Sequence, residues 1–65
     1  MVTVEDIGTR VEDAWGRGGI LRDVVPDWVD PAESPFQSRK RPTAFIRPEH
    51  GGREWLVPPE SVTRT

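Results

Sequence analysis

The clearest alternation of apolar and polar residues lies in two segments, 43–47 and 54–57, which flank a short stretch containing two glycines. If Phe45 pairs with Leu56 in an antiparallel hairpin, side chains that alternate along each strand separate onto two faces. One face is then wholly apolar and holds Ala44, Ile46, Trp55 and Val57. We therefore predict a β-hairpin with this face turned toward a small core.

The other face of the predicted hairpin carries Phe45 and Leu56 beside a cross-strand pair of opposite charge, Arg47 and Glu54. Such a charged pair suits a face in contact with water. Phe45 and Leu56 occupy positions where alternation predicts polar side chains. Either they form the centre of a contact patch, or aromatic residues of a neighbouring loop cover them.

The turn and the end of this hairpin follow from glycine and proline. Residues 49–52, EHGG, form the predicted loop, because glycine adopts positive φ without steric cost. Pro58 and Pro59 end the second strand, since proline has no N–H to donate to a ladder. Residues 60–63 then follow as a turn and a short last strand, with Val62 pointing inward.

The segment 26–42 contains four prolines and a block of charged residues, and it is predicted to be one long loop. Loops of this length in a compact domain are usually functional or disordered, so partial disorder is one expectation here. A purely solvated linker would not need the aromatic residues Trp28 and Phe36. We expect them to fold back over the core or to offer a contact surface.

The first 25 residues fit two patterns. Apolar residues recur at helical spacing in 4–15, behind Thr3, a candidate N-cap with Asp6 three residues on, so an amphipathic helix is one interpretation. Gly8 weakens that helix.

The competing interpretation is a strand over 7–13, a turn through 16–19 and a second strand over 20–25. In it, three residues share one side of the first strand: Ile7, Thr9 and Val11. A glycine cluster between two segments rich in β-branched residues is typical of such a strand pair.

Five stretches then occur in a recognisable order: IGTRVED, WGRGGILRDV, PTAFIRP, GGREW and VPPESV. This succession resembles bacterial SH3-like or KOW-like small β-barrel proteins, in which a G-x-x-V-x-D stretch forms the first strand and a glycine leads the second. A G-R-E-W hairpin, a Pro-rich turn and a last short strand follow. The likeness spans residues 7–63 and implies an all-β barrel of about five short strands. It favours strands at the N-terminus, leaves the loop 26–42 unexplained and implies no catalytic site or cofactor.

Length and composition limit what else this chain can be. A single domain of 65 residues hides only about 60% of the surface that its unfolded chain exposes, so its stability margin is thin. The chain has no Cys and one His, which excludes a disulfide framework and a Cys/His metal site. No apolar run approaches the length of a membrane span, and the start, MVTVEDIG, lacks the features of a signal peptide. We expect a cytoplasmic protein.

Charge is unevenly distributed along the chain. Residues 1–33 carry eight acids and three Arg, whereas residues 34–65 carry three acids and six basic residues. The densest positive run is SRKR at 38–41, and acids in the same loop offset it. A nucleic-acid-binding barrel is therefore the alternative function, with phosphate contacts expected from five basic residues: Arg39, Lys40, Arg41, Arg47 and Arg53.

Catalysis is not expected. His50 stands alone in a turn, and Ser34 and Ser61 have no base nearby in the sequence. The stretch GRGG precedes an expected strand rather than a helix, so it does not match a phosphate-binding loop.

The preferred hypothesis is a non-catalytic interaction or accessory module that binds a protein partner or a second copy of itself. The residues expected to contact that partner are Phe45, Leu56, Arg47, Trp28, Phe36 and Trp15. No metal and no small-molecule substrate are indicated. A third possibility is a helix followed by a hairpin that folds only as an oligomer.

Overall fold

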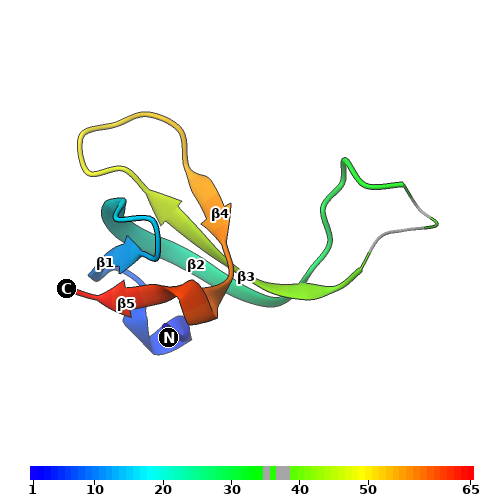
Figure 1. Cartoon of the computed structure of the whole chain (residues 1–65), viewed down its shortest axis with the longest axis horizontal. Coiled ribbons are helices and arrows are strands. Elements are labelled where there is room, and N and C mark those ends of the chain that lie inside the picture. The colour runs from blue at the N-terminus through cyan, green and yellow to red at the C-terminus, as the bar shows by residue number, and fades with distance from the viewer. Residues whose placement is uncertain (35, 37–38) are drawn as a thin grey trace.

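The computed structural model describes residues 1–34, 36 and 39–65 and shows an all-β protein (Figure 1). Five strands and two short 3₁₀ helices follow one another along the chain: η1 (Val4–Asp6), β1 (Arg10–Asp13), β2 (Gly18–Trp28), β3 (Arg41–Arg47), β4 (Trp55–Val57), η2 (Pro59–Ser61) and β5 (Val62–Arg64). The strands form one antiparallel sheet in the order β4-β3-β2-β1-β5. The predicted all-β class and the number of strands are confirmed, although β2, with 11 residues, is longer than predicted. No helix among the described residues is long and apolar enough to cross a membrane.

The amphipathic helix considered for residues 4–15 is wrong. Only a short 3₁₀ turn, η1, forms there: the N–H of Thr3 donates to Asp6 Oδ2 at 2.8 Å, in a reciprocal capping box at the N-terminus of η1. Gly8 then adopts a positive φ of 91°, which ends the turn. The expected strand over 7–13 begins only at Arg10, so Ile7 stays outside it and exposed.

The β3–β4 ladder has the predicted register. Phe45 lies opposite Leu56, and the flanking pairs are Ala44 with Val57 and Ile46 with Trp55. Gly51 and Gly52 both have positive φ, as the turn requires.

The predicted cross-strand pair between Arg47 and Glu54 does not form. β4 begins only at Trp55, so Glu54 lies in the loop and makes an ion pair with Arg22 instead. Arg47 faces Ile20 across the β2–β3 ladder.

The core lies on the inner face of the curved sheet. It is built from Val2, Val11, Leu21, Ala44, Ile46, Val57 and Val62, with Val24 and Trp55 packed against it. Val62 points inward as predicted. Val2 was not predicted to be buried. Its N–H donates to the Pro59 carbonyl at 3.2 Å, which ties the start of the chain to η2 and seats the valine side chain.

The β2 strand begins earlier than predicted, at Gly18, because Gly19 belongs to the ladder and pairs with Val11. A Cβ on Gly19 would lie 2.5 Å from the Arg47 carbonyl oxygen and 2.8 Å from Cγ2 of Ile46. Only glycine lets β2 cross β3 this closely.

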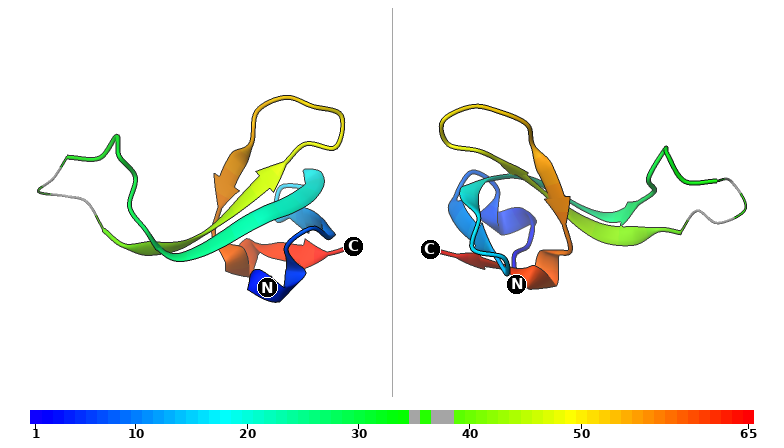
Figure 2. Two further views of the ribbon diagram at one scale, coloured as in Figure 1. Left: turned by 180° about the vertical axis from the view of Figure 1, so that it is seen from behind. Right: turned by 45° about the horizontal axis from the view of Figure 1, so that its top comes forward.

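The predicted loop 26–42 is shorter in the structure, because its ends belong to strands. β2 runs on through Trp28, which pairs with Arg41 of β3, so the connecting segment is 29–40. The described residues at 26–34, 36 and 39–42 form an extension that projects from the rest of the sheet, and we call this extension the arm (Figure 2). The expectation of disorder at residues 35, 37 and 38 lies outside the described residues.

Candidate interaction surface

A buried carboxylate joins two of the five stretches that carry the sequence resemblance, IGTRVED and GGREW. Asp13 closes the G-x-x-V-x-D stretch, and its side chain is fully buried. Its Oδ1 accepts hydrogen bonds from the backbone N–H groups of Trp15 (3.0 Å) and Arg17 (2.9 Å). Its Oδ2 accepts from Arg17 Nε (2.8 Å) and from Nε1 of Trp55 (3.1 Å), the tryptophan of G-R-E-W. Asp13 therefore links the turn 14–17 to β4.

The protonation of Asp13 reflects this environment. Burial raises the pKa of its carboxyl, but hydrogen bonds from Arg17 and Trp15 and the positive charge of Arg17 together lower the pKa below its ordinary value. The group is thus held as a carboxylate with its acceptor capacity used by the protein itself. This is a structural role and leaves no free base for catalysis at this position.

Trp15 belongs to the same cluster. The Arg17 guanidinium lies 5.9 Å from the centroid of Trp15 and 5.1 Å from that of Trp55, both within the range of cation–π attraction. Trp15 is 66% exposed, but it lies at the β1–β2 turn, away from the arm (Figure 1). The structure therefore does not place Trp15 with the other predicted partner-binding residues.

The outer face of the hairpin is partly covered. Phe45 is only 7% exposed, because the Trp28 ring packs edge-on against it at 5.8 Å and the Arg22 guanidinium lies 5.3 Å from its centroid. Arg22 reaches this position because the β2–β3 register shifts between Leu21 and Asp23. Leu56, on the next strand, remains 42% exposed. Trp28 thus covers Phe45, as one alternative predicted, whereas Leu56 is left exposed.

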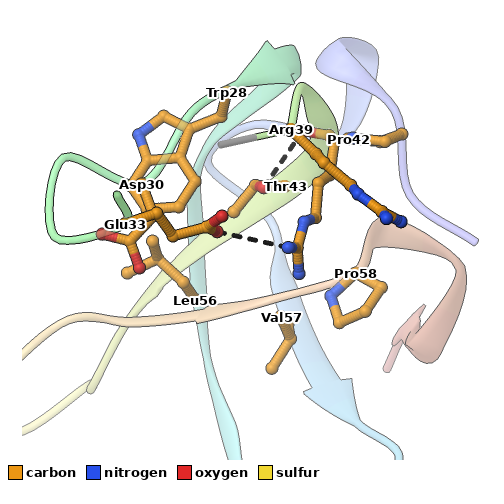
Figure 3. A pocket seen from close by; sticks show the side chains of 10 residues that line it. Trp28, Asp30, Glu33, Arg39, Pro42, Thr43, Leu56, Val57 and Pro58 are labelled. Carbon is orange, nitrogen blue, oxygen red and sulfur yellow. Dashed lines mark hydrogen bonds and ion pairs between the residues drawn. The ribbon is translucent and has the colours of Figure 1, made fainter. Parts of the chain in front are cut away.

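A shallow hollow of about 170 Å³ lies beside Leu56, and we call it the outer hollow (Figure 3). Its lining residues come from the arm, β3 and the end of β4: Trp28, Asp30, Glu33, Arg39, Arg41, Pro42, Thr43, Leu56, Val57 and Pro58. Figure 3 shows Trp28 and Leu56 on one side and Pro58 on the other. The hollow thus combines apolar side chains with charged groups of both signs.

The charged groups of the outer hollow differ in their partners. Arg41 Nη2 lies 3.2 Å from Glu33 Oε1, so these two charges offset one another. Asp30 Oδ1 accepts the Ala32 N–H at 2.9 Å. Among the described residues, neither Asp30 nor Arg39 makes an ion pair.

The remaining predicted contact residues lie elsewhere. Phe36 is 99% exposed in the arm and does not cover Phe45. Arg47 lines a different hollow, with Ile20 and Pro48. Of the residues expected to touch a protein partner, only Trp28 and Leu56 line the outer hollow, and Phe45 packs against Trp28.

The residues named for a nucleic-acid interface are divided between two parts of the molecule. Arg39, Lys40 and Arg41 lie where the arm returns to β3, whereas Arg53 lies in the β3–β4 loop (Figure 1). Ser38, the first residue of that basic run, falls outside the described residues.

Pro42 and Pro58 were not predicted to belong to a site. The predicted register could nevertheless have indicated them. If the pairing of Ala44 with Val57 is continued by one residue, Thr43 lies beside Pro58. Proline ends the ladder there, so two segments part and leave a hollow instead of a further pair.

Within the described part of the chain, no group of three or more His, Asp or Glu side chains could hold a metal ion. Comparison with protein-family models, curated proteins and solved structures found no significant match to this chain.

Proposed function

We propose that this chain is a non-catalytic interaction module that binds a protein segment at the outer hollow. The observation that carries the proposal is that Leu56, which is 42% exposed, lines one hollow together with Trp28 and charged residues of both signs. An apolar centre with an aromatic residue and a charged rim is typical of the central part of protein interfaces.

The charges around the hollow favour a protein partner over nucleic acid. Asp30 and Glu33 stand among the basic residues and would repel a phosphate backbone. A protein segment can instead offer groups of both signs, together with an apolar side chain for Leu56. Mixed charge of this kind contributes to the specificity of protein contacts.

Site-specific photocrosslinking in the native host tests this proposal. A benzophenone amino acid at position 56 is expected to give a discrete protein adduct. The same group at Glu5, an exposed residue of η1, serves as the control and is expected to give none. No adduct at position 56, or the same adducts at both positions, would contradict the proposal.

A further inference from the structure

We propose that the occupant of the outer hollow is a second copy of this chain, bound across a two-fold axis that runs along the arm. This inference rests on the proposed function, because it names the partner for the same surface. It is carried by the charge arrangement of the arm and by the apolar residues on its outer face.

The arm carries two charged residues, Asp30 and Arg39, on opposite sides of the outer hollow. Neither makes an ion pair among the described residues of its own chain. Asp30 follows Trp28, where β2 ends, and Arg39 precedes Arg41, where β3 begins, and these two strand ends are paired with one another. Asp30 and Arg39 therefore stand on the two edges of one hairpin. The other acid–base couple at the hollow, Glu33 with Arg41, is already joined within the chain.

A two-fold axis along the arm uses this arrangement. When two arms lie face to face about such an axis, the β2 edge of one copy lies over the β3 edge of the other. Asp30 of each copy then faces Arg39 of its partner, so two complementary ion pairs form from one pair of residues. The opposite charges are the reason for choosing a copy of this chain as the occupant.

The same axis brings together apolar groups that are exposed or half-buried in the single chain. Leu56 and Trp28 of the two copies face one another across the hollow, and the exposed Phe36 side chains lie on adjacent arms. A contact made only by the two arms and the hollows beside them would be small, and small contacts are weak, with a Kd of about micromolar or higher. Association would also supplement the thin core of a 65-residue domain.

A charge-exchange experiment tests the proposal on the purified full chain. Asp30→Arg gives an arm with two positive charges at the paired positions, and Arg39→Glu gives one with two negative charges. Sedimentation velocity should show dimers of the wild type, with the Kd raised at least about tenfold in either variant alone, because like charges then face each other. An equimolar mixture should form heterodimers with a Kd within about threefold of the wild type. Glu5→Arg, the matched acid-to-arginine control in η1, should leave the Kd unchanged.

Two results would overturn the inference: a wild-type chain that stays monomeric up to about millimolar concentration, or a dimer whose Kd is unaffected by both charge reversals. Circular dichroism of each variant shows that it is folded, so a loss of association is not a loss of structure. If the purified chain is monomeric while position 56 still crosslinks to a different protein in cells, this inference fails and the proposed function stands.

Discussion

Two regions of this protein contain the same three residue types, but the carboxylate is buried in one region and open to solvent in the other. Each combines an aspartate, an arginine and a tryptophan: Asp13, Arg17 and Trp55 form the closed group, and Asp30, Arg39 and Trp28 form the open group. In the closed group the carboxylate is fully buried and accepts four hydrogen bonds. In the open group the aspartate and arginine have no ion pair among the described residues and line a hollow.

The difference shows that burial, and not residue type, separates a carboxylate that is satisfied within its own chain from one that is open to solvent. A buried carboxylate must be satisfied by its own chain, because leaving it unpaired costs several kcal/mol. A carboxylate at the surface is solvated by water and can exchange that water for a partner. The predictions below challenge this comparison in order of expected effect.

The largest effect is expected from Asp13→Ala. The substitution leaves Trp55 Nε1, Arg17 Nε and two backbone N–H groups without their acceptor, so we expect the free energy of unfolding to fall by about 2–4 kcal/mol. For a domain with a small stability margin this would populate the unfolded state substantially. Urea denaturation followed by tryptophan fluorescence measures the change.

Asp30→Ala is the matched variant in the open group. Its carboxylate makes one described hydrogen bond, to the Ala32 N–H, and we expect a change of about 0.5 kcal/mol or less. Equal destabilisation by the two substitutions would contradict the distinction between the closed and the open group.

The sequence predicted the β3–β4 ladder better than the arm, and the reason is physical. The alternation of apolar and polar residues sets the register of β3 and β4, because a slip by one residue would expose the side chains of Ile46 and Ala44 to water. In the arm, strand length depends on pairs such as Trp28 with Arg41, where neither residue has to be buried. No periodic signal marks such pairs, so the loop was predicted to be longer than it is.

Local sequence patterns also could not predict which side chains of distant segments would contact one another. The motif residues Asp13 and Trp55 were each visible in the sequence, but their hydrogen bond joins positions 42 residues apart. The same holds for Arg22, which reaches Phe45 and Glu54 through an irregularity in the β2–β3 ladder. Of the residues that line the outer hollow, the sequence analysis named Trp28 and Leu56 for a protein partner and Arg39 and Arg41 for nucleic acid, but it did not name the two prolines.

The second prediction concerns Gly19, where β2 and β3 approach each other closely. Gly19→Ala places a Cβ against the Arg47 carbonyl oxygen and Ile46, and the strands must part to admit it. We expect a loss of about 1–3 kcal/mol in the free energy of unfolding. Gly18→Ala is the adjacent control, because its nearest contact, the Val11 carbonyl oxygen, is 3.7 Å from the added Cβ. Thermal denaturation of the pair tests the difference. Similar melting temperatures would show that the crossing tolerates a methyl group.

The third prediction is an acid-induced loss of stability that originates in the closed group. The Asp13 pKa is lower in the folded state than in the unfolded chain, where about 3.9 is usual, so the folded state binds fewer protons. This contribution is fully present above the unfolded pKa and is lost as the pH falls through the lower folded pKa, that is, below about pH 4. A carboxyl ¹³C NMR titration measures the pKa of Asp13 directly. A midpoint above that of a model peptide would contradict the assignment.

Asp13→Asn isolates this contribution from the other carboxylates. The amide can still accept the two backbone N–H groups of the turn at its oxygen, but its nitrogen faces the donors of Arg17 and Trp55. The variant should be less stable than the wild type near pH 7, and the gap should narrow as the pH is lowered. Parallel curves for the two proteins would show that Asp13 is not linked to the acid transition.

The smallest effect on stability is expected at the outer hollow. Leu56→Ser alters a side chain that is 42% exposed, and at concentrations low enough to keep the chain monomeric we expect a change of about 0.5 kcal/mol or less. Phe45→Leu, at the cross-strand partner of Leu56, should cost more, about 1 kcal/mol, because that ring is buried under Trp28 and Arg22. The melting temperature should rise with protein concentration in the wild type and not in Leu56→Ser, because only the wild type then gains stability by association. A large loss of stability in the monomeric Leu56→Ser protein would instead show that Leu56 belongs to the core. That result would contradict the proposal that the outer hollow binds a partner.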